Sequence, residues 1–130
     1  MSPARPRRAV YRRRHRLTHA NEFRAVYDAR LTSPRGPIVV FVRPNGMPHP
    51  RLGLSVGKRV GNAVRRNAIK RRLRDAFRHV AAGWPEDTSA GLDVVIAARS
   101  GRVETPDVYA EHLEASLKKL RRVIADRAVR

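Results

Sequence analysis

The side chains with the clearest chemical potential lie between positions 58 and 78, where nine cations stand against one acid, Asp75. If this segment is a helix, four polar side chains share the face opposite an apolar stripe: Asn67, Arg71, Arg74 and Arg78. A helix face that only meets solvent usually mixes both signs of charge. Arginine also matches phosphate, because its planar guanidinium donates two parallel hydrogen bonds. The pattern therefore predicts a surface that binds a polyanion.

The loop before this helix offers a second place for phosphate. Gly57 and Gly61 allow close approach of a ligand to the backbone, and the free N–H groups of a helix N-terminus attract anions. Six further side chains in this region are candidate contacts: Lys58, Arg59, Asn62, Arg65, Arg66 and Lys70. A Walker A nucleotide loop is disfavoured, because Arg59 stands where the magnesium-binding hydroxyl belongs.

Aromatic side chains are scarce, and three of them fall into a pattern. Phe23 and Tyr27 are four residues apart, so they share one face of a helix. Alternation along a strand places Val39 and Phe41 on the same side. Such residues serve either as core or as a platform on which unpaired bases stack beside cations. The residues by themselves leave both interpretations open.

The sequence shows no group of residues spaced as in a catalytic site. Cysteine does not occur, and the five histidines, including His15 and His19, lack the spacing of a zinc site with a third ligand. The acids are scattered, and Ser55 has no evident base. We therefore expect no catalytic residue, no metal site and no cofactor bound by the protein alone.

The composition agrees with one basic, folded domain. The chain has 130 residues, a net charge of +18 and 42% hydrophobic residues, which excludes a disordered basic tail. Residues 1–16 contain seven arginines and no acid, so we expect a mobile arm followed by a single domain over 17–130. No apolar stretch is long enough to span a bilayer, and we expect a cytoplasmic protein.

The predicted elements alternate between helices and strands. Thr18 is a candidate cap for a helix over 19–29 whose apolar stripe extends to Leu31, and the strand-like runs 38–42 and 51–56 suggest a hairpin. Asn62 can cap a helix to about residue 82, a buried strand follows over 92–98, and Thr105 opens a last helix. This order predicts an α+β sandwich. The strand–helix–strand unit over 51–98 is expected to be parallel and, on general preference, right-handed.

Residues 51–77 read RLGLSVGKRVGNAVRRNAIKRRLRDAF, and this string resembles the signature region of the bacterial ribonuclease P protein component. The resemblance extends from about Arg16 to the last helix. It implies the order αβββαβα around a small central sheet, with a left-handed βαβ crossover in place of the general preference. It also implies an endoribonuclease holoenzyme in which the RNA subunit, with Mg²⁺, cleaves the 5′ leader from precursor tRNA and the protein assists.

The same resemblance assigns roles to particular residues. The catalytic RNA would be contacted by Arg16 and by five residues of the middle helix: Arg66, Asn67, Lys70, Arg71 and Arg74. The precursor leader would lie along four side chains: Phe23, Tyr27, Val39 and Phe41. One departure concerns the Arg-Asn-Arg signature of the family, which reads Arg66-Asn67-Ala68 here and leaves Arg65 as a possible substitute. We expect a monomeric protein in a one-to-one complex with RNA. The alternatives are a ribosomal or RNA-chaperone protein without a cleavage partner, and an autonomous nuclease.

Overall fold

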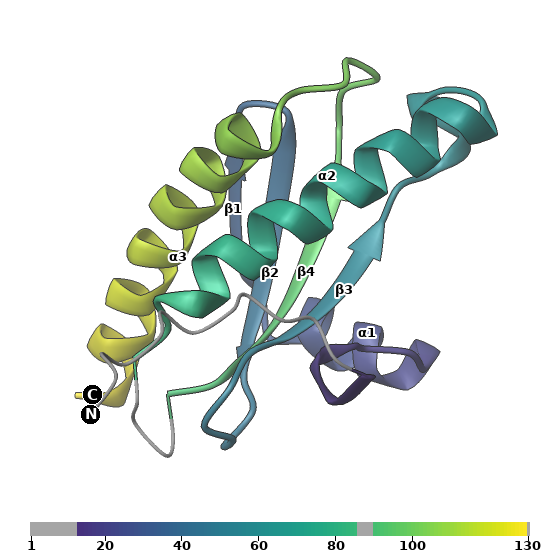
Figure 1. The fold of residues 1–130 in the computed structure, drawn as a ribbon. Helices are drawn as coiled ribbons and strands as arrows, with labels where there is room; N and C mark the ends of the chain where they lie inside the picture. Colours follow the sequence, from purple (N-terminus) through teal and green to yellow (C-terminus); the bar gives the residue numbers. More distant parts are fainter. Residues whose placement is uncertain (1–12, 86–89, 130) are drawn as a thin grey trace, which may run out of the picture.

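A four-stranded sheet forms the centre of the molecule in a computed structural model that describes residues 13–85 and 90–129 (Figure 1). The strands are β1 (Leu31–Arg35), β2 (Ile38–Pro44), β3 (Arg51–Ser55) and β4 (Leu92–Ala98). Their spatial order is β1-β2-β4-β3, and β2 runs antiparallel to both neighbours. β3 and β4 are parallel, which confirms that part of the prediction.

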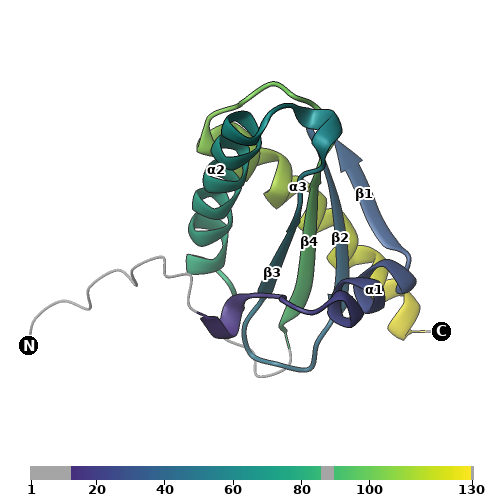
Figure 2. The same ribbon diagram turned by 90° about the vertical axis from the view of Figure 1, so that its right-hand side faces the viewer.

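Three α-helices cover the two faces of the sheet (Figure 2). They are α1 (Ala20–Asp28), α2 (Ala63–Ala82) and α3 (Pro106–Ala128), and short 3₁₀ turns lie at η1 (Arg13–His15) and η2 (Lys58–Val60). The predicted α+β order αβββαβα is therefore confirmed. The predicted caps of the two long helices are also present, because Asn62 Oδ1 accepts from the Arg65 N–H at 2.9 Å and Thr105 Oγ1 from the Val108 N–H at 3.3 Å.

The main core lies between the sheet and the two long helices. The apolar stripe of α2 is buried as predicted, and it meets inward side chains of α3 such as Leu113 and Leu117. A smaller cluster on the other face contains Leu17, Val26 and Val95, with Phe23 and Phe41 packed against it. The helices α2 and α3 therefore cover a larger core on their face of the sheet than α1 covers on the other face.

The predicted hairpin between 38–42 and 51–56 is wrong. β4 lies between these strands, and β2 instead forms a hairpin with β1 through Gly36, whose φ of +54° favours glycine. The expectation that the apolar stripe of the first helix extends to Leu31 is also wrong, and Pro34 by its residue type looks like the end of an element. Both residues belong to β1, which is an edge strand, and an edge strand tolerates proline because one row of its N–H groups needs no partner in the sheet.

The N-terminal boundary also differs from the expectation. His19, not Thr18, is the N-cap of α1, and Glu22 Oε1 accepts from the backbone N–H groups of both residues at 3.1 Å (Thr18) and 3.0 Å (His19). Arg16 pairs with Leu52 at the edge of β3, and η1 also contacts β3, so the last residues of the expected arm lie against the sheet. Residues 1–12 of that arm lie outside the described residues.

Candidate nucleic-acid interface

The cations of α2 point to several sides of the helix. Arg72 turns toward α3 and donates from Nη1 to the carbonyl oxygen of Glu104 at 3.0 Å, whereas Arg71 is exposed. Another group borders a pocket of about 540 Å³ beside β3, which we call the basic pocket. Its lining residues are Arg16, Leu17, Thr18, Phe23, Leu52, Gly53, Leu54, Lys70, Arg74 and Arg78. Four cations and one aromatic ring from three parts of the chain therefore surround one hollow.

The segment that precedes α1 lines one side of the basic pocket. The N–H of Leu17 donates to the carbonyl oxygen of Leu52 at 2.9 Å, which carries the chain along the edge of β3. Figure 2 shows this segment passing beside β3 between α2 and α1. Gly53 then admits the ring of Phe23, because a Cβ at that position would lie 2.6 Å from the Phe23 Cζ atom. The absence of a side chain in β3 thus sets the position of the ring.

Two further aromatic residues continue this face of the sheet beyond Phe23. The rings of Tyr27 and Phe41 meet edge to face with centroids 4.9 Å apart, a favourable geometry for an aromatic pair. Tyr27 is 38% exposed, and Phe41 and Val39 are half-buried. The question that the sequence left open therefore has a mixed answer, because Phe23 and Phe41 pack on the small core and still reach the surface.

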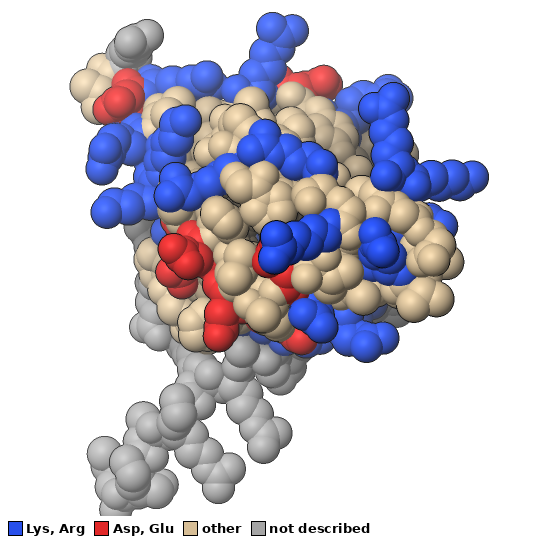
Figure 3. Space-filling view, turned by 90° about the horizontal axis from the view of Figure 1, so that it is seen from above, with Lys and Arg blue, Asp and Glu red and all other residues tan. Residues whose placement is uncertain are grey.

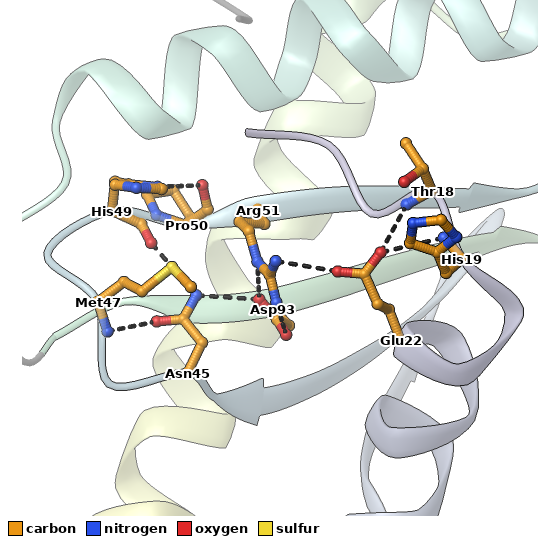
Figure 4. A network of polar contacts seen from close by, with 9 residues as sticks. All are labelled: Thr18, His19, Glu22, Asn45, Met47, His49, Pro50, Arg51 and Asp93. Carbon is orange, nitrogen blue, oxygen red and sulfur yellow. Dashed lines mark hydrogen bonds and ion pairs between the residues drawn. The ribbon is translucent and has the colours of Figure 1, made fainter. Parts of the chain in front are cut away.

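Arg51 fastens α1 to the sheet (Figure 4). Its guanidinium donates to both carboxylate oxygens of Asp93 at 2.8 Å and to Glu22 Oε2 at 3.0 Å. Asp93 is only 1% exposed, and the Asn45 side-chain amide also donates to it, at 3.0 Å. The hydrogen bonds to Asp93 raise the pKa of Arg51, and the backbone N–H of His19 is the main cause that lowers the pKa of Glu22.

This ionic bridge was not recognised from the sequence. Arg51 lies 29 positions from Glu22 and 42 from Asp93, and no local pattern links residues so far apart. Since Glu22 precedes Phe23 on α1, the bridge also fixes the helix that presents the Phe23 ring to the basic pocket. Arg51 is therefore a positioning residue for this pocket.

The structure brings together only part of the predicted set of cations. Arg16, Lys70, Arg74 and Arg78 line the basic pocket, and Arg78 also pairs with Asp75 at 2.6 Å. The exposed side chains of Asn67 and Arg71 lie outside its lining. Arg66 is half-buried, and its solvent-shielded Nε has no hydrogen-bond partner among the described residues.

The remaining predicted contacts lie toward the N-terminal end of α2. Lys58 and Arg59 are exposed in η2, and the side-chain oxygen of Asn62 is used in the helix cap. Arg65 is the substitute suggested for the cation missing at Ala68. Its side chain lies over Gly61, because a Cβ added to Gly61 would be 2.7 Å from the Arg65 Cδ atom. The predicted residues are therefore divided between the basic pocket, the N-terminal end of α2 and the exposed Arg71 in the middle of that helix.

The described residues contain no candidate for a metal site or for a membrane-spanning helix. No group of three His, Cys, Asp or Glu side chains in residues 13–85 and 90–129 is arranged to hold a metal ion. The His15 ring meets the His49 ring edge to face, with centroids 5.0 Å apart. No helix in the same ranges is long and apolar enough to cross a membrane.

Comparisons with known proteins agree with this geometry. The sequence model of the family described as Ribonuclease P matches residues 11–124. The ribonuclease P protein component of Pseudomonas putida strain GB-1 is 39% identical over 120 residues, which cover 86% of this chain and 82% of the relative. The Pseudomonas aeruginosa strain LESB58 protein of the same name is 40% identical over 100 residues, covering 74% and 70%.

Solved structures of the same kind share the fold. The RNase P protein from Thermotoga maritima superimposes with a TM-score of 0.67 at 31% identity, covering 80% of this chain and 96% of that protein. The Staphylococcus aureus RNase P protein gives a TM-score of 0.66 at 31% identity, covering 80% and 93%. Since both the sequence and the fold agree, this chain belongs to the family of ribonuclease P protein components.

Proposed function

We propose that this subunit of ribonuclease P binds the catalytic RNA and holds the 5′ leader of precursor tRNA during endonucleolytic maturation of the tRNA 5′ end. The observation that supports the proposal is the basic pocket, where the ring of Phe23 adjoins cations from α2 and from the segment before α1. In this proposal one protein acts with one RNA subunit, and the RNA holds the Mg²⁺ that cleavage requires.

The pocket suits an unpaired strand for two reasons. Lys70 and Arg74 can neutralise phosphate charge without reading the bases. The Phe23 ring, with Tyr27 and Phe41 farther along the same face, can stack on bases that are not paired. Mature tRNA lacks the leader, so these contacts would favour the precursor over the product.

A reconstitution at low magnesium tests the function as a whole. The full chain, ribonuclease P RNA and precursor tRNA are mixed, and each component is left out in turn. We expect rapid cleavage only when both protein and RNA are present. Cleavage by protein and substrate without the RNA subunit would reject the proposal, and so would cleavage that the protein does not accelerate.

A pair of variants tests the pocket itself. Phe23→Leu keeps an apolar side chain on the small core but removes the ring, and we expect precursor affinity to fall about tenfold while mature tRNA binding stays constant. Arg122→Gln, on the exposed surface of α3, is the control for general charge. Equal losses for precursor and mature tRNA would show that Phe23 serves packing alone.

A further inference from the structure

The carboxyl ends of three strands meet at one edge of the sheet. β1 and β4 are both antiparallel to β2, and β3 is parallel to β4, so β1, β3 and β4 run in the same direction. They end at the upper side of the sheet in Figure 1. The segments there are 35–37, 56–60 and 99–102, and they contain five cations: Arg35, Lys58, Arg59, Arg99 and Arg102. We call these five residues the carboxyl-edge rim.

Close packing fixes these segments against one another. A Cβ on Gly101 would lie 2.4 Å from the carbonyl oxygen of Val60, so the loop after β4 lies directly on η2. Arg99 connects the same loop to the β1–β2 turn. Its Nε donates to the carbonyl oxygen of Gly36 at 2.7 Å, and its backbone N–H donates to the carbonyl oxygen of Pro37 at 3.0 Å. The rim is therefore one surface that extends across the sheet.

The charge of this surface is exposed and largely unopposed within its own segments. All five rim side chains are exposed, and the three segments contain no Asp or Glu. Arg102 does pair with the neighbouring Glu104 at 3.3 Å, but it is 82% exposed, and so open an ion pair contributes little stability. Figure 3 looks down on this end of the molecule and shows cationic side chains distributed over it.

The chemistry of the rim differs from that of the basic pocket in one respect. Its three segments contain no aromatic residue, so they offer no ring on which an unpaired base could stack. Cations without rings contact phosphate, and contact to phosphate alone suits a helix whose bases are already paired. Four strands spaced about 4.8 Å apart make the rim roughly 14 Å wide, which is enough for several backbone contacts.

We propose that the carboxyl-edge rim binds the phosphate backbone of double-helical RNA, separately from the unpaired strand in the basic pocket. The inference rests on the proposed function only in taking RNA as the partner. Arg35, Arg99 and Arg102 thereby gain a role that neither the signature helix nor the pocket gives them. With both surfaces occupied, the protein would hold a helix and an unpaired strand of RNA in a fixed relative position.

The test compares two triple variants of equal charge in the full chain. Arg35→Gln/Arg99→Gln/Arg102→Gln neutralises part of the rim, and Lys118→Gln/Lys119→Gln/Arg122→Gln neutralises three exposed cations of α3. The probes are a blunt RNA duplex and an unpaired RNA strand of the same length, each titrated at several salt concentrations. Thermal unfolding checks that the variants fold, and Arg102→Gln alone replaces the triple variant if it does not.

We expect the rim variant to bind the duplex at least about tenfold more weakly and its salt dependence to fall by roughly one per lost contact. Its affinity for the unpaired strand should change no more than that of the α3 variant. Equal weakening of duplex binding by both variants would overturn the inference, because only net charge would then matter. Loss of unpaired-strand binding by the rim variant alone would also overturn it. Phe23→Leu, tested beside them, reports on the pocket independently.

Discussion

The two faces of the sheet are built from the same alternating strands but are covered to different extents. On the face toward α2 and α3, the inward side chains are almost completely inaccessible, and Val40 and Ile96 are 0% exposed. On the opposite face, Val39 and Phe41 remain half-buried although they lie on the same strand as Val40. Burial therefore separates two functions, because one face holds the fold together and the other leaves apolar and aromatic surface available.

The lengths of the helices explain this difference. α2 and α3 have 20 and 23 residues, so each is about 30 Å long or more and can extend across the sheet. α1 has nine residues and is about 13 Å long, so it covers only part of the opposite face. Phe23 of α1 lines the basic pocket on this less covered face, where we propose that RNA binds.

The largest effect is expected from a comparison of two adjacent valines. Val40→Ala should lower the free energy of unfolding by about 2 to 3 kcal/mol, because it removes two buried methyl groups and leaves a cavity. Val39→Ala, on the half-covered face, should cost about 1 kcal/mol or less. Urea unfolding of both variants measures the difference. Equal losses would show that the two faces are equally well packed.

The second effect concerns the bridge that holds α1 on the sheet. Arg51→Met should cost about 2 kcal/mol, because it leaves the buried carboxylate of Asp93 with Asn45 as its remaining side-chain donor. Precursor affinity should also fall, since α1 presents Phe23. Arg51→Lys should recover only part of both losses, because an ammonium cannot donate in the bidentate geometry.

Arg24→Met, an exposed position on α1, is the control for removal of a cation. We expect it to leave stability within about 0.5 kcal/mol of the parent chain. If Arg51→Met were as mild as this control in unfolding and binding, the bridge would have no part in positioning α1.

The third effect should appear more in binding than in stability. Tyr27→Leu breaks the edge-to-face contact with Phe41 and should cost about 1 kcal/mol of unfolding free energy. Because Tyr27 is 38% exposed on the open face, loss of its ring should weaken binding of an unpaired RNA strand roughly tenfold. Fluorescence anisotropy with labelled RNA measures this. Unchanged affinity would limit the RNA site to the basic pocket.

The elements that were predictable from the sequence are those whose determinants are local. The cap at Asn62 and the stripe through Ile69 and Leu73 depend on residues a few positions apart, and the structure confirms both. The division of the α2 cations was not predictable in the same way. A helical projection places Arg74 on the face opposite the apolar stripe and Lys70 beside that face, but only the packing of α2 beside β3 shows that both border a pocket with Phe23.

The errors arose from contacts between distant parts of the chain. The two strands expected to form a hairpin are separated by β4, which pairs with residues 48 to 60 positions away in β2 and 42 positions away in β3. β1 was not predicted because it contains Pro34. Proline ends most strands, but an edge strand tolerates it. The bridge through Arg51 could not be found either, because each of its partners looks like an ordinary scattered acid until the sheet and α1 are assembled.

The smallest effect concerns Glu22 and the pH dependence of stability. Hydrogen bonds from the backbone N–H groups of His19 and Thr18, together with the charge of Arg51, lower the pKa of Glu22 from its ordinary value of 4.5. A carboxylate with a lowered pKa stabilises the folded state above its unfolded pKa, and this contribution is lost as the pH falls through the folded value.

Glu22→Gln should therefore cost less than about 1 kcal/mol of unfolding free energy near pH 7. The difference from the parent chain should vanish when the pH falls well below 4.5. Melting temperatures of both proteins across this range measure it. A difference that stays constant with pH would mean that the Glu22 carboxylate charge does not contribute to holding α1, and the bridge would then depend on Asp93 alone.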